Sequence, residues 1–94
     1  MKKATIDLTN CKYLMELHER IKGGLNLQNG YGKNWSAFWD EINVNIKCDF
    51  IIVKGSKTVA DELKGSVEKM REILERNKQY RAHSSSPFNY EFVD

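Results

Sequence analysis

The chain has 94 residues, a length that suits one domain with a single hydrophobic core, and we expect that domain to span residues 1–94. Hydrophobic residues make up 40% of the chain and charged residues 30%, as in an ordinary soluble globular protein. The formal net charge is only +2, and no run of five or six basic residues occurs, so the composition does not indicate binding to nucleic acid or to an anionic membrane.

The first half of the chain begins with a strand and a helix. Residues 4–8 alternate apolar and polar side chains, which is typical of a short strand. Apolar residues then recur at helical spacing over residues 14–21. We expect Thr9 or Asn10 to cap the start of this helix and the glycine pair at 23–24 to end it.

An irregular loop is expected over residues 25–33, where an Asn-Gly turn is followed by a second glycine. Asn34 then stands where a helix cap is needed, and the pattern predicts a helix from there to about Asn43.

The second half predicts two more strands. Residues 50–53 form an unbroken apolar run rich in β-branched residues, which suits a strand covered on both faces. A short helix is expected over residues 58–64, broken by Gly65, and a longer helix capped by Ser66. Residues 88–93 alternate again as a closing strand. The expected inner stripe of the long helix is Val67, Met70, Ile73, Leu74 and Asn77.

The predicted element order is therefore β-α-α-β-α-α-β. Strands separated by helical crossovers pair in parallel, with right-handed connections. The fold class that follows is α/β: a small two-layer domain with a three-stranded parallel sheet packed against about four helices.

Motifs of enzymes and metal sites are mostly absent from the sequence. It contains no phosphate-binding glycine loop, no GxSxG and no HExxH. His18 falls on the apolar stripe of the first helix, so we interpret it as a packed residue rather than a catalytic base. No spacing of Cys11, Cys48 and the histidines matches a metal site. We expect neither an enzyme nor a bound cofactor or metal.

The first residues of the chain and its two cysteines indicate the cellular compartment of the protein. The opening residues MKKATIDLTN lack the apolar run of a signal peptide, and no apolar segment is long enough to span a bilayer. We therefore expect a cytoplasmic protein, in which Cys11 and Cys48 are buried or free thiols rather than a disulfide.

The stretch GYGKNWSAFWDEI, residues 30–42, concentrates aromatic side chains beside acidic ones. At 100° per residue, one arc of this helix holds its large apolar residues, and Ser36 and Asp40 lie beside that arc toward solvent. The apolar arc consists of Trp35, Phe38, Trp39 and Ile42. The arc alone allows two interpretations: core packing with an ordinary solvated Asp40, or a preorganised patch that presents one carboxylate to a basic partner.

The pattern Tyr31-Gly32-x-Asn34-x-x-Ala37-x-Trp39-Asp40 resembles the signature of the barstar family, small intracellular inhibitors of secreted bacterial ribonucleases. The resemblance begins with KKATI near the N-terminus, runs to about residue 53 and continues more loosely beyond it. It implies the three-stranded parallel sheet of that family. It also implies that the region 30–45 blocks the active site of a bacterial, barnase-like ribonuclease.

The resemblance further implies roles for single residues. The carboxylate at Asp40 would enter the phosphate-binding pocket of the enzyme and meet its cationic side chains. Trp39 would support Asp40, more through core packing than through direct contact, and Asn34 would cap the helix. The other residues implied at the contact surface are Gly30, Tyr31, Gly32, Ser36, Asn45 and, on the last helix, Glu75, with Glu72 as the alternative.

The sequence also departs from the family pattern. The best-known member has tyrosine at Gly30, a carboxylate at Ser36 and tryptophan at Asn45, and it is markedly acidic, whereas this chain carries +2. Long-range attraction to a basic enzyme should therefore be weaker here. Two functions follow: a monomeric ribonuclease inhibitor, or an immunity, antitoxin or interaction module on the same fold for a different toxin. In neither case do we expect direct contact with nucleic acid or a membrane.

Overall fold

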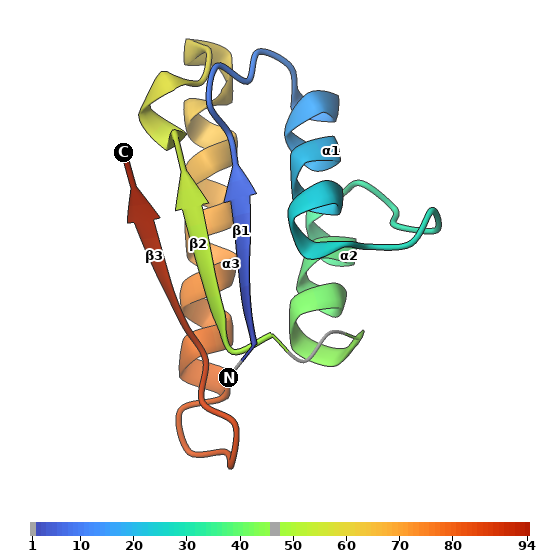
Figure 1. Cartoon of the computed structure of the whole chain (residues 1–94), viewed down its shortest axis with the longest axis vertical. Coiled ribbons are helices and arrows are strands. Elements are labelled where there is room, and N and C mark those ends of the chain that lie inside the picture. The colour runs from blue at the N-terminus through green and yellow to red at the C-terminus, as the bar shows by residue number, and fades with distance from the viewer. Residues whose placement is uncertain (1, 46–47) are drawn as a thin grey trace.

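The computed structural model describes residues 2–45 and 48–94, and within them the chain forms one three-stranded sheet and three α-helices (Figure 1). The strands are β1 (Lys3–Asp7), β2 (Phe50–Lys54) and β3 (Asn89–Val93), and the α-helices are α1 (Leu14–Leu25), α2 (Trp35–Asp40) and α3 (Lys64–Tyr80). The sheet has the order β1-β2-β3, and both pairings are parallel. The predicted α/β fold with three parallel strands is confirmed.

The sheet is covered by helices on one face. Figure 1 shows α3 behind the sheet, α1 beside β1, and no helix in front. In β2 the buried Ile51 and Val53 alternate with the half-buried Phe50 and Ile52. The expectation of a strand covered on both faces is therefore wrong. Phe50 is shielded instead by the side chain of Lys3, whose Nζ lies 5.7 Å from the centre of the aromatic ring.

Helix α1 does not end at its glycine pair but continues to Leu25. It ends at Asn26, whose φ of 54° is left-handed and whose backbone N–H donates to the carbonyl of Gly23. The start is also different from the prediction, because Tyr13 rather than Thr9 or Asn10 stands at the cap position. There the Glu16 carboxylate accepts the backbone N–H of Lys12 at 2.9 Å.

Gly24 serves a packing purpose rather than ending the helix. A Cβ atom at this position would overlap the carbonyl oxygen of Thr5 and lie 3.0 Å from the Cα of Ile6. The absence of a side chain is what lets α1 approach β1 this closely.

The helix expected over residues 58–64 is absent, which leaves three α-helices in the described chain where about four were predicted. Two 3₁₀ turns, Ser56–Thr58 and Asp61–Leu63, take its place. Between them Ala60 is extended, with ψ at 151°, and its N–H donates to the carbonyl of Cys11 at 2.9 Å. This bond holds the segment against the β1–α1 connection, and the second turn runs directly into α3.

Helix α3 begins at Lys64, so Gly65 lies inside its first turn and Ser66 is not its cap. The helix continues through Gly65 without a break. A Cβ at this position would meet nothing within 4 Å, so packing does not require a glycine here. The predicted inner stripe of α3, from Val67 to Asn77, is confirmed as buried.

Cys11 and Cys48 are free thiols in the core, and burial raises the pKa of both. Across the two described segments, none of the helices is both long enough and apolar enough to cross a membrane.

Candidate functional site

The loop before α2 is held from inside by Tyr31. This side chain is only 6% exposed, and its hydroxyl lies 2.8 Å from Nδ1 of the buried His18 on α1. Burial raises the pKa of Tyr31, and burial together with the nearby Lys33 lowers the pKa of His18. Both groups are therefore neutral near pH 7. The side chain of Tyr31, a residue predicted at the contact surface, is therefore buried and supports the loop from inside.

Asn34 caps α2, as predicted. Its side-chain Oδ1 accepts the backbone N–H of Ala37 at 2.7 Å, and its Nδ2 donates to the carbonyl of Gly32 at 3.2 Å. A Cβ on Gly32 would lie 3.3 Å from both the Ala37 Cβ and the Asn34 Nδ2, so the turn fits tightly around the first residues of the helix. Lys33 has a left-handed φ of 52° and pairs with the carboxylate of Glu19 on α1. The cap and the loop thus fix where α2 begins.

The apolar arc predicted for α2 is partly confirmed. Phe38 and Ile42 are fully buried, whereas Trp35 and Trp39, one helical turn apart on the same side of the arc, are half-buried. The Trp35 ring lies 4.8 Å from the ring of His18, centre to centre, and the Trp39 ring meets Tyr80 of α3 edge-on at 6.1 Å. The tryptophans therefore join α2 to its neighbours and also reach the surface.

Ser36 and Asp40 are both exposed on α2, as the helical spacing predicts. They line a hollow of about 370 Å³ between α2 and α3, together with Trp39. The remaining residues of this hollow, which we call the α2–α3 hollow, are Trp35, Lys69, Ile73 and Arg76.

Gly30 and Asn45 lie on the other side of α2. After Asp40 the helix continues as one π-helical turn, Glu41–Asn45, and the exposed Asn45 lies at its end. With Tyr31, they line a second hollow of about 440 Å³ between the loop and this turn. Six of the predicted contact residues thus form two groups on either side of α2: Ser36, Trp39 and Asp40 in one, and Gly30, Tyr31 and Asn45 in the other.

Glu75, the predicted contact residue on α3, lines neither of these two hollows. Its carboxylate accepts hydrogen bonds of 2.7 Å from the hydroxyl of Tyr90 on β3 and from the side chain of Gln79. Burial and this carboxylate raise the pKa of Tyr90 to about 12. Glu75 therefore lies on the side of α3 that faces β3. Glu72, the alternative, is exposed and lies one helical turn from both Lys69 and Arg76, nearer the α2–α3 hollow.

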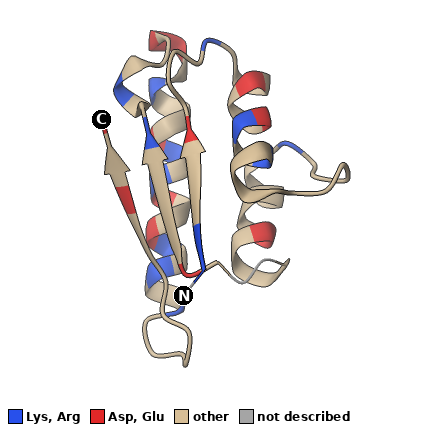
Figure 2. Ribbon diagram, viewed as in Figure 1, with Lys and Arg blue, Asp and Glu red and all other residues tan. Residues whose placement is uncertain are grey.

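The sequence prediction missed the two cations of α3 beside Asp40. The guanidinium of Arg76 lies 5.4 Å from the centre of the Trp39 ring, and Lys69 stands two turns earlier on the same face. Positions 69, 73 and 76 follow helical spacing, so extending the predicted inner stripe around Ile73 would have placed both cations at this edge. Figure 2 shows that basic and acidic residues are interspersed along α3.

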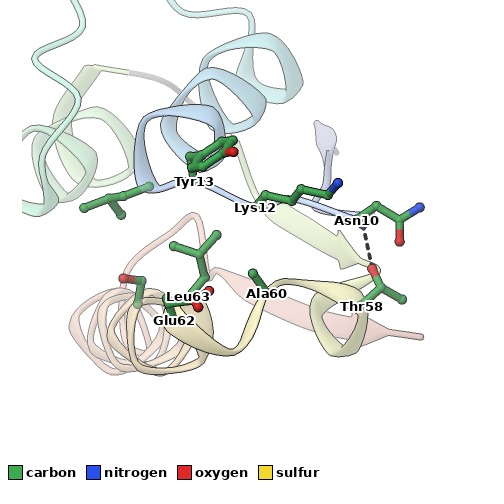
Figure 3. Close-up of a pocket in the computed structure, with 9 residues that line it drawn as sticks. Asn10, Lys12, Tyr13, Thr58, Ala60, Glu62 and Leu63 are labelled. Carbon is green, nitrogen blue, oxygen red and sulfur yellow. Dashed lines mark hydrogen bonds between the residues drawn. The ribbon is translucent and has the colours of Figure 1, made fainter.

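A larger hollow lies elsewhere, at the carboxyl ends of β1 and β2 (Figure 3). It has a volume of about 930 Å³, and Tyr13 faces Leu63 and Ala60 across it. The backbone N–H of Asn10 donates to the Thr58 hydroxyl at 2.8 Å and closes one end. None of the predicted contact residues lines this hollow. Within residues 2–45 and 48–94, no three His, Cys, Asp or Glu side chains are close enough to hold a metal ion.

The fold and these surfaces define a small α/β protein with a braced loop and a helix that carries the exposed carboxylate of Asp40. A family model described as Barstar (barnase inhibitor) matches residues 1–93. The chain therefore belongs to the barstar family, a family of inhibitors that bind barnase-like ribonucleases. A comparison with curated proteins finds no match to this sequence.

Proposed function

We propose that this protein inhibits a barnase-like ribonuclease by covering its active site with the region 30–45. The observation that carries the proposal is the placement of Asp40, which is exposed on a helix whose opposite face is fully buried. In this proposal the Asp40 carboxylate takes the place of a substrate phosphate among the cationic side chains of the enzyme.

The support beneath Asp40 favours a role as an anchor. The start of α2 is fixed by the Asn34 cap, and Asn43 in the following turn donates to the side chain of the buried Asn77 on α3 at 3.2 Å. Trp39, adjacent to Asp40, is held against Tyr80. Since these contacts hold the backbone without a partner, binding would immobilise little beyond the carboxylate itself. Side chains held in this way are typical of the few residues that dominate binding energy.

The test is a titration of the protein into a ribonuclease assay with barnase as the enzyme. The parent protein should abolish turnover at a stoichiometric amount. Asp40→Ala should weaken inhibition by about 2 kcal/mol or more, which is about 30-fold. Asp61→Ala is the matched control, since Asp61 is an exposed acid in the turn before α3 and should leave inhibition unchanged. Equal inhibition by parent and Asp40→Ala would remove Asp40 from its role.

A second candidate is an immunity or antitoxin role against a toxin other than a ribonuclease. The observation in its favour is the neutral Ser36, which lies beside Asp40 where the family resemblance implies a carboxylate. In that case the parent would inhibit no barnase-like ribonuclease. It would instead retain a partner without ribonuclease activity, and Asp40→Ala would show whether the same helix binds that partner.

A further inference from the structure

The α2–α3 hollow combines opposite charges at one place. Asp40 lies on its α2 wall, while Lys69 and Arg76 lie on its α3 wall. All three side chains belong to exposed residues. If this hollow faced only the cations of a ribonuclease, Asp40 would be paired with an opposite charge. Lys69 and Arg76, however, would face charges of their own sign.

The two cations are not neutralised by ion pairs within the described chain. None of its four ion pairs includes Lys69, Arg76 or Asp40. Glu72 is spaced to offset part of the charge, three residues after Lys69 and four before Arg76, but it does not line the hollow. Arg76 is held over the Trp39 ring rather than against a carboxylate. Donors on both cations are therefore available to a partner.

The walls of the hollow would strengthen such contacts. Trp35, Trp39 and Ile73 supply its apolar surface, and a partner seated there would exclude water from around the charges. Like charges brought together in a desolvated interface repel strongly, whereas a carboxylate there would gain charge-assisted hydrogen bonds. Charge complementarity therefore favours an anionic group opposite α3.

We propose that the α2–α3 hollow receives an aspartate or glutamate side chain of the target protein, bound by Arg76 and Lys69. This inference rests on the proposed function and adds a requirement to it: the target presents a carboxylate next to the cationic pocket that takes Asp40. Arg76 and Lys69 then determine specificity, because an enzyme with only cations at this place is disfavoured.

The experiment uses poly-L-glutamate as a probe at low ionic strength, with intrinsic fluorescence as the readout. The chain has two tryptophans and both line the α2–α3 hollow, so their emission reports on this place. The double variant Lys69→Gln/Arg76→Gln should bind the probe at least tenfold more weakly than the parent. Lys54→Gln/Lys57→Gln removes the same charge from exposed residues outside the hollow and is the matched control, with an expected change of less than threefold.

Two further arms separate the sources of binding. Asp40→Asn should bind poly-L-glutamate more tightly than the parent, because it removes a repelling carboxylate from the same hollow. Oligouridylate should bind more weakly than poly-L-glutamate, and tighter binding of the oligonucleotide would overturn the inference in favour of a nucleic-acid site. The inference also fails if the parent does not bind poly-L-glutamate, or if the two double variants are weakened equally. Since the probe is not a ribonuclease, these results are independent of the inhibition assay.

Discussion

Gly23 and Gly24 are neighbours in the last turn of α1, yet replacing each with alanine should change stability in opposite directions. A Cβ on Gly23 would meet nothing within 4 Å. Alanine there should stabilise the protein by about 0.5–1 kcal/mol, because it restricts the unfolded chain and favours the helix. This result would also show that the glycine pair does not act as a helix stop.

Gly24→Ala should instead destabilise the protein. The new methyl group would overlap the carbonyl oxygen of Thr5 and lie 3.0 Å from the Cα of Ile6, and backbone atoms cannot rotate away as a flexible side chain can. Helix α1 would have to move off β1, and overpacking of this kind costs about 1–3 kcal/mol. The two alanine variants should therefore differ by about 1.5–4 kcal/mol.

The assay is urea unfolding followed by far-ultraviolet circular dichroism, with the free energy of unfolding taken from midpoint and slope. For a domain of this size, 1 kcal/mol corresponds to a shift in Tm of about 4–8 °C, so thermal melting provides an independent check. Equal effects of the two substitutions would refute the reasoning, as would stabilisation by Gly24→Ala. Either result would mean that α1 does not approach β1 closely at Gly24.

Three other predictions concern single side chains, two of them supports of the site and one a link between α3 and the start of β2. Because the pKa of His18 is lowered in the folded protein, the unfolded chain binds a proton at this residue at a higher pH than the folded chain does. The free energy of unfolding should therefore fall as pH drops from 7 through about 6.5. His18→Gln should flatten this dependence in urea titrations at several pH values. Asn34→Ala should cost about 1 kcal/mol through loss of the cap, while Asn34→Asp should preserve it, as measured by urea unfolding. Arg81→Lys should cost about 2 kcal/mol in thermal melts, because the guanidinium donates to the carbonyls of Cys48 and Ser86 and to the Asp49 carboxylate.

The parts of the molecule that the sequence predicts well are those set by local chemistry. Alternation in residues 4–8 and 88–93 predicts strands, and the structure has them at Lys3–Asp7 and Asn89–Val93. The cap at Asn34 depends on a side chain that bonds three residues ahead, so it is visible in a short window. The exposure of Asp40 follows from helical spacing once that start is fixed.

The errors arise where one residue type serves two purposes. Glycine ends helices, but it also permits close packing, and only the distance between α1 and β1 shows that Gly24 does the latter. The β-branched run in β2 is apolar on both faces, although helices cover only one of them. For residues 58–64, helical composition was overridden by the long-range bond from Ala60 to Cys11. These outcomes depend on tertiary contacts that no local window contains.

The charges of the site illustrate the same limit most clearly. Charged residues along a helix are usually a solvated face, and the formal charge of +2 describes the chain as a whole. Only the packing of α2 against α3, through Trp39 and Tyr80, brings Arg76 and Lys69 beside Asp40 while it turns Glu75 toward β3. Net charge governs the rate of encounter over long distances, but the sign at each point of a desolvated contact governs which partner stays bound. For this protein, selectivity should therefore follow the local pairing of charges across the α2–α3 hollow rather than the total.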